Sequence, residues 1–140
     1  MSSKRVIIIG GGLVGIELAE FLQERGREVT VLEAGSIFGK EMALPRRWRS
    51  LYELRRHDVA LIGNARVEAV TDDGVVYETG GERRTSAADS VIVAVGTREN
   101  RALAESLDGL GAEVYLIGDC ERVGYLEGAI HDAARVARAI

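Results

Sequence analysis

The chain has 140 residues, of which 46% are hydrophobic and 29% are charged, and its formal net charge is −4. This composition is typical of one globular domain, and the acidic balance argues against nucleic acid or an anionic membrane surface as the main partner. The single cysteine excludes an internal disulfide, a CxxC redox pair and a cysteine zinc cage. Because the N-terminus carries no signal-peptide pattern and no apolar run is long enough for a membrane span, we expect a cytoplasmic protein.

The N-terminal part of the chain predicts a strand, a helix and a second strand. The β-branched run Val6–Ile9 is typical of a strand buried on both faces, and it ends at Gly10. Apolar residues then recur at helical spacing from Leu13 to Arg25. The apolar stripe of this helix is expected to consist of Val14, Leu18, Phe21 and Leu22. Gly26 is suited to end the helix in a left-handed conformation, and residues 28–33 form the next strand.

The middle of the chain predicts a second helix, a third strand and an antiparallel meander. Pro45 opens the helix, which runs to about Arg56, because proline is tolerated in a first helical turn. Val59–Ile62 is the third strand. Short segments separated by Asp and Gly predict the meander. Its strands are expected at Arg66–Val70, Gly74–Glu78 and Glu82–Ser86.

The C-terminal part predicts two more buried strands and a closing helix. The apolar runs Ser90–Val95 and Val114–Ile117 are the strands, and Leu126–Ile140 is the helix. Strands that alternate with helices favour a parallel sheet covered on both faces. We therefore expect an α/β fold over residues 1–140: a Rossmann-like, doubly wound parallel sheet with an inserted antiparallel meander.

The turn between the first strand and the first helix has the sequence G-G-G-L-V-G, which is a G-x-G-x-x-G motif. Gly10 allows a sharp turn, Gly12 lets the backbone approach a pyrophosphate, and Gly15 with Ala19 lets the helix pack close to the strand. The N-terminus of the helix offers free N–H groups to the phosphates. We expect this turn to bind a dinucleotide through Gly10, Gly11, Gly12, Leu13, Val14 and Gly15.

An acidic residue, Glu33, ends the second strand and is followed by Ala34. A carboxylate at this point accepts hydrogen bonds from the adenosine ribose and repels a 2′-phosphate. Glu33 therefore favours NAD over NADP, and it is equally compatible with FAD. The alternative is an exposed glutamate with no ligand. Three nearby arginines have the charge to bind a 2′-phosphate, but they are expected instead on the solvent face of the second helix: Arg46, Arg47 and Arg49.

Three further positions are candidates for contacts with a cofactor. Ala94 and Gly96 end the later strand, where small residues let a loop lie against a nucleotide; the alternative is a plain strand-to-loop turn. Asp119 either caps the final helix, which sequence alone favours, or accepts a hydrogen bond from a flavin ribityl hydroxyl. Cys120 is expected to be an inert, packed thiol. We expect no catalytic residue and no metal site.

Together these segments resemble the C-terminal region of the NADH:flavin oxidoreductases related to 2,4-dienoyl-CoA reductase, 2-enoate reductase and trimethylamine dehydrogenase. Residues 6–33 are similar to the second glycine-rich segment of that family, which binds NAD(P)H or ADP. Residues 42–59 resemble the helix that follows, and residues 90–100 resemble the A-x-G-x-x-x-N strand end. Residues 114–120 and 129–140 resemble the returning FAD segment with its Gly-Asp motif.

The resemblance implies a pyridine-nucleotide unit over residues 1–100 and the end of an FAD domain over residues 113–140. It also implies partners, because the family carries an FMN barrel, an iron–sulfur cluster and a first glycine-rich segment that this chain lacks. The family has proline and arginine where this chain has Val123 and Gly124. Without the usual flavin half, we expect residues 114–117 to join the same sheet in the order 3-2-1-4-5.

The expected function is an NAD(H)-binding module of a flavin-dependent oxidoreductase, which positions the nicotinamide for hydride transfer to flavin. One alternative is a small FAD-binding domain that uses the glycine turn, Glu33 and Asp119 in one site. Another is a non-catalytic ADP-binding or docking domain. The chain by itself is expected to have little activity.

Overall fold

The computed structural model describes residues 4–140, which form two compact units; one ends at Gly96 and the other begins at Thr97. The first unit contains β1 (Arg5–Ile9), α1 (Leu13–Gln23), β2 (Glu28–Leu32), α2 (Leu44–Arg56), β3 (Ala60–Ile62), β4 (Arg66–Thr71), β5 (Gly74–Thr79), β6 (Glu82–Ala87) and β7 (Ser90–Val93). The second contains α3 (Ala102–Ser106), the 3₁₀ turn η1 (Gly118–Cys120) and α4 (Tyr125–Ala137).

Four parallel strands in the order β3-β2-β1-β7 form the central sheet of the first unit. Ile8 of β1 pairs in register with Val31 of β2 on one side and with Ile92 of β7 on the other. Each crossover between neighbouring parallel strands leaves the sheet and returns to it, as parallel pairing requires. The predicted α/β fold with a Rossmann-like parallel sheet is therefore confirmed.

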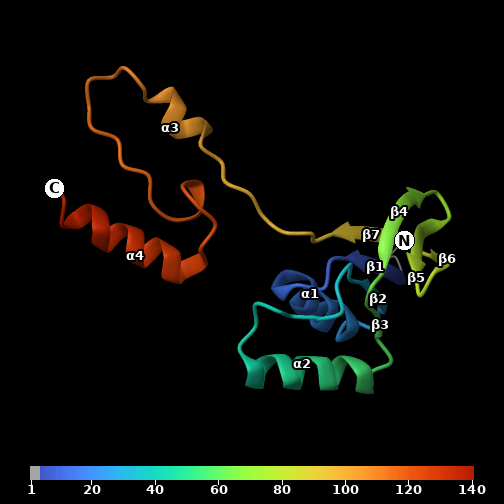
Figure 1. Ribbon diagram of the computed structural model, residues 1–140. Helices are drawn as coiled ribbons and strands as arrows, with labels where there is room; N and C mark the ends of the chain where they lie inside the picture. The colour runs from blue at the N-terminus through green and yellow to red at the C-terminus, as the bar shows by residue number, and fades with distance from the viewer. Residues whose placement is uncertain (1–3) are drawn as a thin grey trace. The chain divides into compact units, whose positions relative to one another are not determined.

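Helices α1 and α2 cover one face of this sheet (Figure 1). Alternate residues of β1 and β2 point to this face, and they pack against apolar side chains of both helices. The fully buried members of this core include Ile8, Val31, Ile16, Ala19 and Leu54. The two helices are also joined by an ion pair between Arg46 and Glu20.

The antiparallel sheet β4-β5-β6 covers the opposite face. Ile7 and Leu32 of the central sheet pack there against Val75 and Tyr77 of β5. The three strands lie close to the predicted positions, and they fill the long connection between β3 and β7. The first unit is thus a three-layer structure of helices, parallel sheet and antiparallel sheet.

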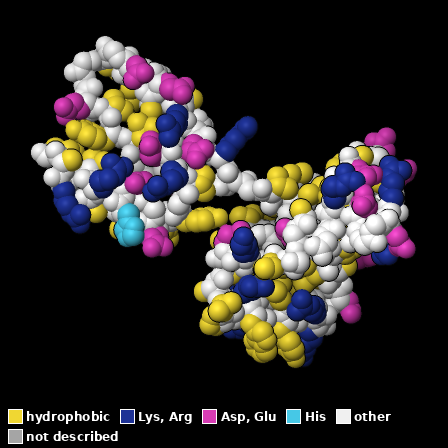
Figure 2. Space-filling model, in the orientation of Figure 1, with side chains coloured by type: hydrophobic (Ala, Val, Ile, Leu, Met, Phe, Trp, Pro, Cys, Tyr) yellow, Lys and Arg dark blue, Asp and Glu magenta, His cyan; other side chains and the backbone are white. Residues whose placement is uncertain are grey.

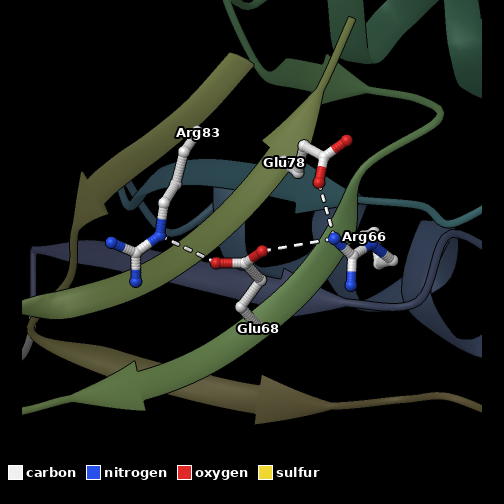
Figure 3. A network of polar contacts seen from close by, with 4 residues as sticks. All are labelled: Arg66, Glu68, Glu78 and Arg83. Carbon is white, nitrogen blue, oxygen red and sulfur yellow. Dashed lines mark hydrogen bonds and ion pairs between the residues drawn. The ribbon is translucent and has the colours of Figure 1, made fainter. Parts of the chain in front are cut away.

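Four charged side chains form a network on the antiparallel sheet (Figure 3). Arg66 pairs with Glu78 directly across β4 and β5, and it also contacts Glu68, which accepts a 2.8 Å hydrogen bond from Arg83. The hydrogen bond with Glu78 raises the pKa of Arg66. These groups are exposed, so their main effect is to mark this face as the solvent side, and their contribution to stability is small.

The outer face of α2 carries an exposed aromatic pair. The rings of Trp48 and Tyr52 stack with centroids 5.6 Å apart and planes 13° apart. Trp48 is 72% exposed, and α2 lies at the lower edge of Figure 2, where hydrophobic side chains and basic side chains adjoin. Arg46 and Arg49 are exposed as predicted, whereas Arg47 is half-buried.

The predicted fifth strand is wrong. Residues 114–117 form no strand, and the parallel sheet of the described chain ends at β7. The side chains of Val114, Tyr115 and Ile117 are between 39% and 46% exposed. An apolar run predicts burial but does not specify the strand with which it pairs, so the pattern could not identify a neighbour. Helix α3 and the turn η1 were not predicted.

The predicted apolar stripe of α1 is only partly right. Leu18 and Leu22 pack against the core, but Val14 and Phe21 are exposed. The buried face consists instead of Gly15, Ile16 and Ala19. The small residues Gly15 and Ala19 let the helix axis approach the sheet closely, and Ile16 fills the space between them and the core. The Phe21 ring is covered by the Arg25 guanidinium, 3.4 Å from the ring centroid.

Candidate functional site

The glycine turn lies at the carboxyl end of β1, between the ends of β2 and β7. Gly10 N–H donates a 2.8 Å hydrogen bond to the carbonyl of Leu32 in β2. The N–H of Ala94 donates a 2.7 Å bond to the carbonyl of Ile9. The turn, the end of β2 and Ala94 are therefore held together by backbone bonds, at the edge of a parallel sheet where ligands bind in such folds.

Two glycines of the turn are required by the fold. Gly10 has φ +109°, and a Cβ there would lie 2.2 Å from the carbonyl oxygen of Ala94. A Cβ on Gly15 would lie 1.9 Å from the carbonyl oxygen of Gly10. Both contacts are with backbone atoms, which cannot move aside without shifting β1, β7 or α1. The close approach of helix and strand predicted from the motif is present here.

Gly12 differs from these two glycines. Its φ is −72°, which any residue can adopt, and it is the N-cap of α1. A Cβ there would meet only the flexible carboxylate of Glu41, at 3.3 Å. Packing and backbone conformation therefore do not demand a glycine at this position, whereas the close approach of a phosphate would.

The start of α1 has no cap from its own N-cap side chain and no acidic residue in its first turn. The backbone N–H of Leu13 instead donates a 3.2 Å hydrogen bond to Oε2 of Glu41. Leu13 packs partly against the core, while Val14 is exposed beside the turn. The helix terminus is therefore the kind of positive dipole end that attracts an anion.

The Glu33 carboxylate lies against the glycine turn. Its Oε2 accepts a 2.6 Å hydrogen bond from the N–H of Gly11, and its Oε1 accepts a 2.9 Å bond from the N–H of Gly35. The side chain is half-buried, and the next residue, Ala34, is exposed. These two bonds fix the orientation of the carboxylate at the end of β2, so it is held in place before any ligand binds.

A loop of residues 34–43 folds over the turn, and sequence reasoning missed its role. Gly39 N–H donates a 2.7 Å bond to the carbonyl of Gly11. Phe38 and Met42 are buried in the helix-side core, and a Cβ on Gly11 would lie 2.5 Å from the Phe38 ring. Neither periodicity nor a motif marks these residues, because the path of the loop is set by tertiary packing.

Asp119 belongs to the second unit. Its Oδ1 accepts 3.0 Å hydrogen bonds from the N–H groups of Gly124 and Tyr125, at the start of α4, which confirms the capping interpretation. The prediction that Cys120 is packed is wrong, since its side chain is exposed and donates to the carbonyl of Ile117. Of the two other small-residue candidates, Ala94 lies against Gly10, and Gly96 is exposed with φ +118°.

The rest of the described chain offers few alternative sites. Over residues 4–140, no group of three or more His, Cys, Asp or Glu side chains is arranged to hold a metal ion. In the same residues, no helix combines the length and the apolar character that crossing a bilayer requires. The glycine turn with Glu33 is therefore the strongest candidate site.

A strand, a glycine turn and a helix at the edge of a parallel sheet, with an acid at the end of the next strand, define a Rossmann-type nucleotide-binding domain. The comparison with known families agrees with this class. Residues 1–114 match the model of the family described as pyridine nucleotide-disulphide oxidoreductase. The chain belongs to this family.

Individual relatives are oxidoreductases of greater length. The chain is 33% identical over 141 residues to a bilirubin reductase of Mediterraneibacter gnavus, covering 100% of this chain and 22% of that protein. It is 31% identical over 142 residues to a nitric oxide reductase FlRd-NAD(+) reductase of Vibrio vulnificus, covering 86% of this chain and 36% of the relative. A solved 2-naphthoyl-CoA reductase superposes with a TM-score of 0.88 at 34% identity, over 98% of this chain and 21% of the other. The chain thus spans between about a fifth and a third of the length of these proteins.

Proposed function

We propose that the chain is the NAD(H)-binding module of a flavin-dependent oxidoreductase, positioning the nicotinamide cofactor for hydride transfer to flavin. The observation that carries this proposal is the contrast within the turn. Gly10 and Gly15 are required by the fold, whereas the fold does not require Gly12 and a ligand that approaches the backbone at the start of α1 would. Membership of the family and the lengths of the relatives support a role as one part of a larger enzyme.

The residues of the site fit the two halves of a dinucleotide. The backbone N–H groups at the start of α1 would bind the pyrophosphate, close to Gly12. Glu33 would bind the adenosine ribose, because its carboxylate is held at the end of β2, beside the turn. Bound NADH supplies the hydride, and this chain contributes binding and orientation.

The same carboxylate supports NAD rather than NADP as the partner. A 2′-phosphate on the ribose would bring two further negative charges close to Glu33, which repels them at short range. The name of the Vibrio vulnificus relative refers to NAD(+), in agreement with this preference. The FAD alternative is less well supported, because Oδ1 of Asp119, the expected ribityl contact, already accepts two N–H groups at the start of α4.

Titration of the purified chain with NADH, NADPH, ADP and FAD tests the proposal. We expect NADH to bind and NADPH to bind at least about tenfold more weakly, because of the charge on Glu33. Tightest binding of NADPH would contradict this role for Glu33. Tightest binding of FAD would support the small FAD-binding domain instead, and ADP binding as tight as that of NADH would support a docking domain.

A Gly12→Ala variant tests the location of the site. We expect it to bind NADH at least about tenfold more weakly, because a Cβ would stand between the backbone and the pyrophosphate. The fold should be unaffected, since the Cβ meets only a flexible side chain. Gly128→Ala in α4 is the matched control, because a Cβ there meets nothing within 4 Å. Equal affinity of both variants would place the site elsewhere.

A further inference from the structure

An acidic side chain lies where the proposed dinucleotide would place its phosphates. Oε2 of Glu41 accepts the N–H of Leu13 at 3.2 Å, and it lies 3.3 Å from the position of a Cβ on Gly12. Both carboxylate oxygens of Glu41 lie within 3.9 Å of that position. The space left by the missing side chain of Gly12 therefore faces a negative charge of the chain itself.

We infer that Glu41 is an internal competitor of the dinucleotide pyrophosphate and sets the affinity of the site; this inference rests on the function proposed above. A carboxylate that accepts an amide hydrogen at a helix N-terminus makes the same kind of contact as a phosphate oxygen. The two anions cannot share the N–H of Leu13, and at such a short distance they repel each other. Glu41 therefore has to leave before the pyrophosphate can bind.

The position of Glu41 is defined by its neighbours and not by the carboxylate alone. Phe38 and Met42, on either side of it in the loop, are buried in the core, and Gly39 is bonded to the carbonyl of Gly11. The backbone of the loop is thus anchored to the turn. The side chain of Glu41 itself is exposed, so rotation of its χ angles is sufficient to move the carboxylate into solvent.

Release of this contact costs free energy that the ligand must supply. The conformer that can bind is only a fraction of the population, and the apparent affinity is reduced by that fraction. The contact also satisfies an N–H at the start of α1 when no ligand is present. Glu41 thus stabilises the empty site and lowers its affinity for any ligand that brings phosphate to this point.

The Glu41→Gln variant tests this inference, with Glu17→Gln as the matched control. Both changes remove one negative charge, but Glu17 is an exposed residue within α1, beyond the turn that holds the site. We expect Glu41→Gln to bind NADH and ADP about threefold to tenfold more tightly than the unchanged chain, because the charge-assisted contact is lost. Glu17→Gln should differ from the unchanged chain by less than about twofold.

Adenosine is the control ligand, because it lacks phosphate and should show no gain with Glu41→Gln. If both variants bind NADH as the unchanged chain does, or if the gain is equal for adenosine, Glu41 does not compete with phosphate and the inference is wrong, while the proposed function stands. If the unchanged chain and both variants bind neither NADH nor ADP, the proposed function fails, and this inference fails with it.

Discussion

The two compact units of the chain differ in how their own residues pack. All the buried apolar side chains of the described residues lie in the first unit, where two clusters fill both faces of the parallel sheet. From residue 97 to 140, the buried residues are only Gly118 and Asp132, and large apolar side chains are exposed. The contacts within this unit include hydrogen bonds, such as the one that the N–H of Gly118 donates to the Asp132 carboxylate. The first unit therefore owes its stability to apolar burial, and the described residues of the second unit form no comparable core.

The largest effect expected from this difference concerns matched isoleucines in the two units. Ile16 in α1 is fully buried, and Ile130 in α4 is 65% exposed. Ile16→Ala should lower the free energy of unfolding of the first unit by about 2–5 kcal/mol, through lost burial and a new cavity. Ile130→Ala should change stability by less than about 0.5 kcal/mol. Denaturant unfolding of both variants measures this, and equal losses would show that the second unit has a core after all.

A smaller effect is expected at Asp119, whose carboxylate caps the start of α4. Asp119→Ala removes the two hydrogen bonds to Gly124 and Tyr125, which should destabilise α4 by about 0.5–2 kcal/mol, the usual cost of a lost helix cap. Amide hydrogen exchange should quicken in α4 and stay unchanged in β1 and β2. Faster exchange throughout both units would mean that they unfold together and are not independent in stability.

The smallest effect is expected from the exposed ion pair that joins β1 to the start of β7. Asp89 accepts hydrogen bonds from the guanidinium and backbone N–H of Arg5, which hold the pKa of this carboxyl well below its usual range. Its stabilisation is therefore complete above the unfolded pKa, about 3.9, and is lost as the pH falls below that value.

Asp89→Asn should thus lower the melting temperature slightly at pH 7, and the gap to the unchanged chain should narrow as the pH falls from 4 toward 2. Thermal unfolding of both proteins across this pH range provides the measurement. A gap that stays constant down to pH 2 would show that the charge of Asp89 makes no contribution.

Local patterns predicted most of the first unit, because its elements are specified by nearby residues. The all-apolar β1, the glycine turn and the acid Glu33 are features that a short window of sequence contains. The partners of Glu41 and Phe38 could not be predicted in this way, since the loop that carries them is positioned by contacts with residues far along the chain. Residues 114–117 were wrongly expected to form a strand, because their local apolar pattern is typical of one. No strand of the described sheets pairs with them.

The exposed Trp48 offers a way to follow the unfolding of the first unit separately from that of the second. It is the only tryptophan of the chain, and it lies on α2 in the first unit, stacked on Tyr52. Its fluorescence therefore reports on the first unit alone, whereas far-ultraviolet circular dichroism sees the helices of both. Melting curves recorded by these two signals on one sample would coincide for a single cooperative molecule and would separate for two independent ones.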